Sequence, residues 1–144
     1  MHIQHFQQAI LWPTIALAVL VYAVWFTLFV QRMRHLKQNP PKADSFATGA
    51  RAMAYFEPVE MPANNLRNLF EMPVLYFALV PLLLYTGQVT VAQTVLAWAY
   101  VILRAAHSVI HVTGGAVIRR FQIYLASCAV LLAMWIGFAI DISV

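Results

Sequence analysis

The stretch that decides the fold is AILWPTIALAVLVYAVWFTLFV, residues 9–30, which holds no charged side chain. A helix rises about 1.5 Å per residue, and the hydrocarbon core of a bilayer is about 30 Å thick. The stretch is therefore long enough to cross a membrane as a helix. Backbone groups in lipid must be bonded within their own segment, which favours a helix over irregular structure. We predict a transmembrane helix here.

Three further apolar stretches follow, at residues 68–85, 89–112 and 121–140. We expect helices at about residues 9–31, 64–86, 89–113 and 118–141, with a cytoplasmic loop at about 32–63. The predicted fold class is all-α: an integral membrane four-helix bundle of up-down topology, forming a single membrane domain over residues 1–144. The composition agrees, because 62% of residues are hydrophobic and only 10% are charged, whereas soluble domains carry about 25% charged residues.

Cations are distributed unevenly over the links between these helices. Of the nine Lys and Arg residues, six lie within residues 31–67 and two are Arg119 and Arg120. None lies in residues 86–88 or at either end of the chain. The positive-inside rule then predicts that the first and third loops are cytoplasmic and that both termini lie on the opposite side. No basic run is long and exposed enough to indicate a nucleic-acid partner.

The third predicted helix carries a row of polar side chains. Tyr100, Arg104, His107, Ser108 and His111 follow one another at spacings of 4, 3, 1 and 3 residues. These spacings put the five side chains on one side of a helix. Charges inside a membrane segment are costly unless they are paired or solvated, so they mark candidate functional sites. We expect this row to face a neighbouring helix, another subunit or a water-filled cleft.

The second predicted helix begins with polar residues that also share one face: Asn64, Arg67, Asn68 and Glu71. Glu71 lies roughly 10 Å into its helix, and Arg104 lies roughly 15 Å before the end of the third. The two charges are thus expected at similar depth. Either they form a buried ion pair that fixes the register of the helices, or they grip opposite ends of a zwitterionic ligand in a pocket open to the cytoplasm.

The histidines and the cysteine allow other interpretations of the site. His107 and His111 are four residues apart, a spacing that lets two imidazoles bind one metal or haem. Arg104 lies one turn away and repels a second cation, so we predict no metal site. Cys128, the only cysteine, excludes an intramolecular disulfide and is interpreted as a packing residue. His2 and His5 are interpreted as solvated tail residues.

Three segments together resemble the MAPEG family, the membrane-associated proteins in eicosanoid and glutathione metabolism. They are NNLRNLFEMP (residues 64–73), AYVILRAAHSVIH (residues 99–111) and VIRRFQIY (residues 117–124). The asparagine–glutamate pair with a following proline gives the match its specificity, and the polar row of the third helix adds weight. With four helices in matching order, the resemblance covers most of the chain.

The resemblance implies a homotrimer with glutathione bound between adjacent subunits at the cytoplasmic end. It implies that Asn68, Glu71 and Arg104 match residues that contact glutathione, and that His107 and His111 stand where characterised synthases have ligand-contacting tyrosines. It implies that Arg119 or Arg120 matches the catalytic fourth-helix arginine that lowers the thiol pKa. Asn64 departs from the family pattern, since synthases have an arginine there, and Arg67 lies one turn away. These departures resemble a divergent, bacterial-type member in an inner (plasma) membrane.

The sequence therefore predicts a membrane-embedded protein that binds glutathione or a related thiol as co-substrate. If it is an enzyme, it is a glutathione transferase or glutathione-dependent peroxidase acting on lipophilic substrates. The ligand-binding candidates are Asn64, Arg67, Asn68, Glu71, Tyr100, Arg104, His107 and His111. The alternative is a non-enzymatic membrane subunit that packs on or regulates a larger complex.

Overall fold

The computed structural model describes residues 8–143, and every described element is helical. In chain order these are α2 (Leu11–Gln38), α3 (Gly49–Phe56), the 3-10 turn η1 (Glu57–Val59), α4 (Met61–Leu69), α5 (Pro73–Thr86), α6 (Val91–Val112) and α7 (Val117–Asp141). The histidines interpreted as tail residues, His2 and His5, lie outside the described residues.

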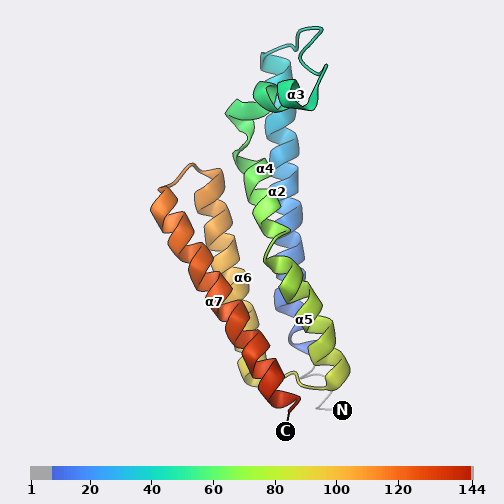
Figure 1. The fold of residues 1–144 in the computed structure, drawn as a ribbon, viewed down its shortest axis with the longest axis vertical. Coiled ribbons are helices and arrows are strands. Elements are labelled where there is room, and N and C mark those ends of the chain that lie inside the picture. Colours follow the sequence, from blue (N-terminus) through green and yellow to red (C-terminus); the bar gives the residue numbers. More distant parts are fainter. Residues whose placement is uncertain (1–7, 144) are drawn as a thin grey trace.

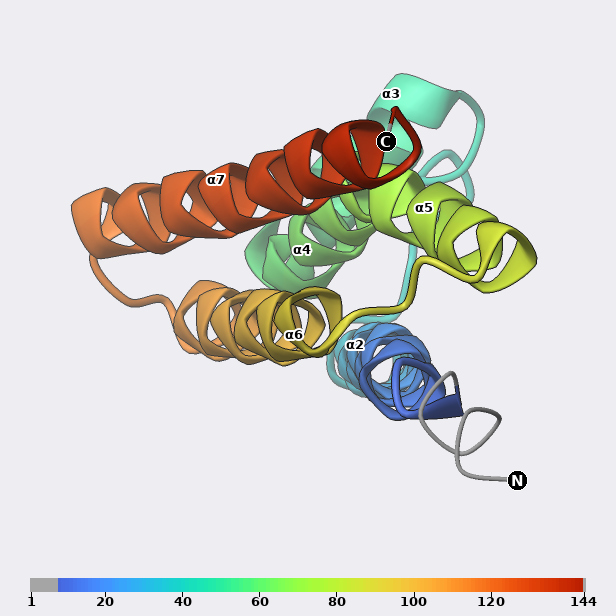
Figure 2. The same ribbon diagram turned by 90° about the horizontal axis from the view of Figure 1, so that it is seen from below.

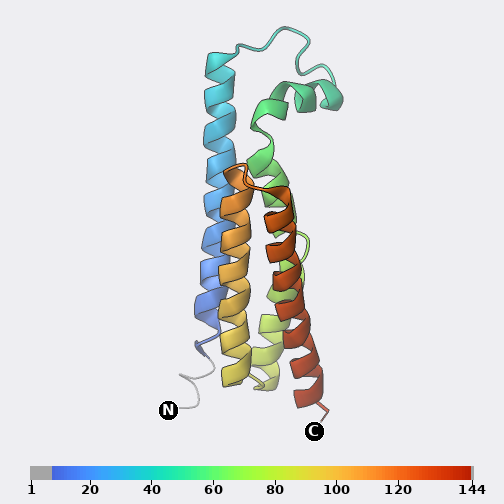
Figure 3. The same ribbon diagram turned by 90° about the vertical axis from the view of Figure 1, so that its left-hand side faces the viewer.

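Four spans within the described residues are long and apolar enough to cross a membrane: Leu11–Gln38, Met61–Thr86, Val91–Val112 and Val117–Asp141. They run alternately up and down, and the described ends of the chain lie at the same end of the bundle (Figure 1, Figure 3). The predicted all-α fold with four apolar spans is confirmed. Large apolar side chains, among them Tyr22, Trp25 and Phe26, cover the outside, as expected for contact with lipid.

The second span is not one helix but two, α4 and α5, separated at residues 70–72. Pro73 begins α5 and has no N–H to donate to the carbonyl of Leu69, so the hydrogen-bond ladder is interrupted there. We predicted one continuous helix over residues 64–86, and the structure differs from this prediction by the break. It lies directly at Glu71, the acidic candidate site residue.

Residues 32–63, predicted as a loop, contain several turns of helix. α2 continues to Gln38 and stops before Pro40 and Pro41, because a residue that precedes a proline disfavours the helical conformation. Within α2, Arg32 forms an ion pair with Glu60 at 3.2 Å, and its guanidinium lies 4.8 Å from the centre of the Phe56 ring. These contacts hold η1 and the start of α4 against α2.

The helices do not pack equally closely. α6 packs along α7 and against α2, as the view along the bundle shows (Figure 2), whereas α5 and α7 touch sparsely. The apolar core lies in the half of the bundle nearer the described ends of the chain, where Leu17, Leu79, Leu83 and Met134 are fully buried. Towards the α6–α7 turn, α7 diverges from α4 (Figure 1). The candidate site lies in this diverging half.

Candidate functional site

The five residues of the polar row predicted on α6 are all buried inside the protein, with exposed fractions of 0 to 4%. They are Tyr100, Arg104, His107, Ser108 and His111. None of these side chains faces lipid. Their partners come from α4, α5 and α7.

Arg104 sits at the centre of the row. Its Nη2 donates to the backbone carbonyl of Asn68 at 2.7 Å, and its Cζ lies 5.6 Å from the centre of the Tyr124 ring. Its other two nitrogens, Nε and Nη1, are buried without a hydrogen-bond partner in the described chain. A buried cation with free donors is costly unless a ligand or water pairs with it.

The Glu71–Arg104 ion pair considered from the sequence does not form in the protomer. Across residues 8–143 the ion pairs within 4 Å are Arg32–Glu60 and Arg51–Asp44. The side chain of Glu71 is exposed, and the guanidinium of Arg104 binds a main-chain oxygen just before the helix break. The Arg104 guanidinium and the Glu71 carboxylate can therefore each still bind another group.

His107 contacts two residues of α7, Arg120 and Tyr124. Its Nδ1 lies 3.1 Å from the carbonyl oxygen of Arg120, and because a carbonyl only accepts, Nδ1 carries the hydrogen. Nε2 then has a free lone pair, and it has no partner within the described chain. The ring centres of His111 and Tyr124 lie 5.6 and 5.8 Å away. No third His, Cys, Asp or Glu joins the two histidines as a metal-ligand group in the described part of the chain.

Asn65 belongs to this cluster, although sequence reasoning missed it. It is fully buried, and its Oδ1 accepts a hydrogen bond from Ser108 at 3.3 Å. The neighbouring candidate, Asn64, is only half-buried. The sequence held only a weak signal: Asn65 precedes the apolar Leu69 by one helical turn and so shares its face, but this does not show the partner on α6.

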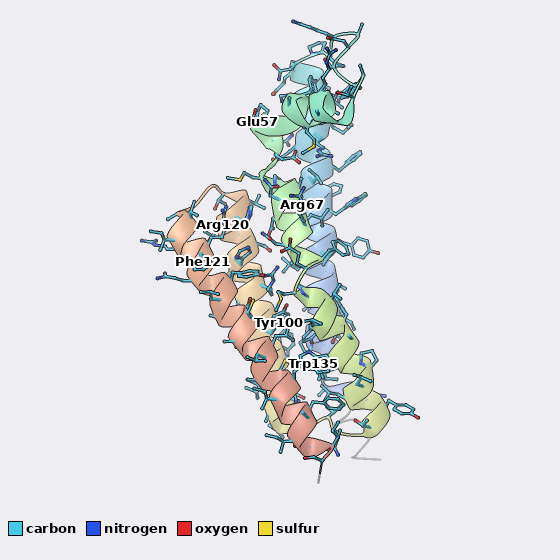
Figure 4. The ribbon with its side chains drawn as sticks, in the orientation of Figure 1. Glu57, Arg67, Tyr100, Arg120, Phe121 and Trp135 are labelled. Atoms are coloured by element: carbon cyan, nitrogen blue, oxygen red, sulfur yellow. The ribbon has the colours of Figure 1, made fainter. Side chains whose placement is uncertain are left out.

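A cleft of about 320 Å³ opens beside this cluster, between the α4–α5 break and α7 (Figure 4). It is lined by Asn68, Glu71, His107, Val117, Arg120, Phe121 and Tyr124. Four of the predicted site residues thus meet in one cleft: Asn68, Glu71, His107 and Arg120. Sequence reasoning missed Tyr124, although it follows Arg120 by four residues on the same face of α7.

The remaining candidates lie elsewhere. Tyr100 is deeper, stacked on Tyr76 with ring centres 5.2 Å apart. Arg67 and Arg119 are exposed and do not line the cleft of their own protomer. His111 and Asn64 do not line it either.

The fold and the cleft define a class of protein: a polytopic helical membrane protein with a charged cleft in one half of its bundle. The family model described as "MAPEG family" matches residues 10–140, and the chain belongs to this family. Neither the comparison with curated proteins nor that with solved structures found a match. Family membership indicates a glutathione-related integral membrane protein.

Proposed function

We propose that this chain binds glutathione, or a related anionic thiol, in the cleft between the α4–α5 break and α7. It uses the thiol to conjugate lipophilic electrophiles or to reduce lipid hydroperoxides. The observation that carries the proposal is the buried Arg104, which has two unpaired nitrogens and contacts Asn68 and Tyr124, two residues that line the cleft. Arg104 itself does not line the cleft, whereas Glu71 and Arg120 do.

The charges of the cleft complement those of glutathione, which has two carboxylates, one ammonium group and a thiol. Guanidinium groups suit carboxylates because they form paired, charge-assisted hydrogen bonds. Glu71 suits the ammonium group. A guanidinium close to the sulfur favours the thiolate, which is the reactive nucleophile. A cleft of about 320 Å³ falls within the size range of small-molecule sites.

The working form is proposed to be a homotrimer in a bacterial inner membrane, with the first and third loops cytoplasmic. Family membership and the distribution of Lys and Arg support this arrangement. In a trimer the exposed Arg67 and Arg119 can approach the cleft of an adjacent subunit. The second substrate, dissolved in lipid, then enters from the membrane side.

The first prediction tests the cleft. Glu71→Gln removes the partner of the ammonium group and is expected to weaken glutathione binding about tenfold, which corresponds to about 1.4 kcal/mol. Because Glu71 is exposed in the protomer, folding is expected to be unaffected. Calorimetric titration of the detergent-purified protein measures the dissociation constant.

The matched control is Glu57→Gln, which removes the same charge from an exposed residue of η1 far from the cleft (Figure 4). It is expected to bind glutathione like the native protein. Equal binding by the native protein and by Glu71→Gln would remove the proposal. Absence of thiol binding in both, together with a stoichiometric co-purifying protein, would favour the role of a non-enzymatic subunit.

A further inference from the structure

A second hydrogen bond connects α4 to α6, about one helical turn from the bond between Asn68 and Arg104. The Oγ atom of Ser108 donates to Oδ1 of Asn65 at 3.3 Å, and the Ser108 and Asn65 side chains are 3% and 0% exposed. Asn65 precedes Asn68 by three residues, and Ser108 follows Arg104 by four, so the two bonds lie side by side along antiparallel helices. We call Asn65 and Ser108 the buried pair.

Apolar packing provides few anchors for α4, although the helix contacts both α2 and α6. Of its nine residues, those that are buried are Pro62, Asn65 and Leu69, and the break at residues 70–72 separates it from α5. Arg67, labelled on α4 in Figure 4, is exposed. A short membrane helix with so few buried apolar side chains depends on polar contacts for its orientation.

The buried pair and Leu69 select the same orientation of α4. Neighbouring positions of a helix differ by about 100° around its axis. Rotation by one position would offer the amide of Asn64 to Ser108, but it would bury Asn68 in place of Leu69, because residues four apart share a face. In the observed orientation the side chain of Asn68 instead lines the cleft. Together with Leu69, the pair therefore determines which side chains α4 presents to a ligand.

The buried pair also carries a cost in stability. Nδ2 of Asn65 is buried without a hydrogen-bond partner within the described chain, and a buried donor without a partner is destabilising. In coiled coils, a buried asparagine with such a cost selects one register of the helices. Packing alone does not explain Asn65, since a leucine could fill the same space without this cost.

We propose that Asn65 and Ser108 are positioning residues of the candidate site. They fix the orientation and register of α4 against α6, so that the carbonyl of Asn68 meets Arg104 while the Asn68 side chain lines the cleft. Neither member of the pair lines the cleft itself. The inference rests on the proposed function only for the identity of the ligand.

Cysteine accessibility tests the orientation of α4 without any ligand. In a Cys128→Ser background, which removes the only native cysteine, Asn68→Cys and Leu69→Cys are made separately, and their rates of reaction with N-ethylmaleimide are measured in detergent. Asn68 lines the cleft and Leu69 is 1% exposed, so the cysteine at position 68 is expected to react faster. Adding Asn65→Leu is expected to bring the two rates closer together. An unchanged ratio of rates would overturn the inference.

Gln93→Leu is the matched control for this measurement. Gln93 is also a buried amide, and its Nε2 donates to the carbonyl of Met134 at 2.9 Å. It lies about 22 Å along α6 from Ser108 and contacts α7, so the variant is expected to leave the ratio of rates unchanged. A change as large as that caused by Asn65→Leu would show that loss of any buried amide disturbs α4, and it would also overturn the inference.

Glutathione binding separates positioning from structural support. Asn65→Leu is expected to weaken binding about fivefold, within the range for breaking one contact between residues, while the melting temperature stays the same or rises. Stability is kept because the Ser108 hydroxyl can donate to a carbonyl of its own helix. Adding Ser108→Ala is expected to weaken binding no further, because the two residues share one contact. Binding that falls only in step with the melting temperature, or that weakens equally again with Ser108→Ala, would contradict a positioning role.

The two kinds of measurement separate this inference from the proposed function. Native-like binding by Asn65→Leu together with an unchanged ratio of rates overturns the role of the buried pair and leaves the proposed function standing. A changed ratio of rates in a protein that binds no glutathione supports the role of the pair and removes the proposed function.

Discussion

At the scale of the residue, Arg104 has two tasks. One nitrogen holds the carbonyl of Asn68 at 2.7 Å, and two others remain unpaired in a buried setting. The planar guanidinium allows both, because its donors point in different directions from one rigid group. The residue thus connects α6 to the second span and still has donors for an anion.

A conservative change separates these tasks. Arg104→Lys keeps the charge but replaces the planar fork with a single ammonium group, which cannot bind the carbonyl of Asn68 and a ligand in the same geometry. We expect the variant to fold, with glutathione binding weakened about tenfold, or about 1.4 kcal/mol. Calorimetric titration measures the affinity, and circular dichroism during heating measures folding. Undiminished affinity would show that Arg104 acts only as a link between helices.

At the scale of the element, the break between α4 and α5 builds the site. An unbroken helix would use the carbonyls before Pro73 for its own ladder. The break instead leaves the carbonyl of Asn68 to Arg104 and directs Glu71 into the cleft. Local backbone irregularity inside a membrane is tolerated where protein groups satisfy the freed atoms.

Restoring the main-chain hydrogen bonds across the α4–α5 break is expected to weaken ligand binding at the site. Pro73→Ala supplies an N–H for the carbonyl of Leu69 and favours a continuous helix, so Glu71 and Asn68 shift relative to α7. We expect weaker thiol binding without loss of thermal stability, measured by titration and by a melting curve on the same preparation. Pro81→Ala, within α5 and away from the cleft, is the control. Equal binding by both variants would show that the break does not position Glu71.

The limits of sequence reasoning are clearest at this scale. Apolar runs predicted the four spans, and helical spacing indicated Asn68, Glu71 and His107. The arginine of the fourth helix, Arg119 or Arg120, was indicated only by the family resemblance. Spacing could not show that the carbonyl of Asn68, not the side chain of Glu71, receives Arg104, since that depends on how two helices pack. Asn65 and Tyr124 were missed because one polar residue on a helix face resembles any other until its neighbour is known.

At the scale of the whole molecule, the cleft is open and several candidate side chains point away from it. Arg119 and Arg120 are adjacent, yet only Arg120 lines the cleft of its own protomer. In the proposed trimer, we expect Arg119 of one subunit to lie at the cleft of an adjacent subunit. The two arginines then belong to different sites although they are neighbours in the chain.

Mixed oligomers test this arrangement. Arg119→Gln and Arg120→Gln are each expected to weaken thiol binding, and co-expression of the two variants is expected to recover it in part. Recovery arises because some clefts combine a native Arg120 with a native Arg119 from the adjacent subunit. Titration of co-purified, doubly tagged oligomers measures the recovered fraction. No recovery, with oligomers assembled normally, would place both arginines in one protomer's site or outside it.

The hydrogen bond from Arg104 to Asn68 also has a bearing on biosynthesis. A lone arginine near the centre of a membrane helix costs about 2.5–3.5 kcal/mol on insertion. Its acceptor lies earlier in the chain, on the preceding span, and residues 87–90 form a short turn between the two spans. The acceptor is therefore already synthesised when the third span emerges, and we expect the second and third spans to enter the bilayer together as a hairpin.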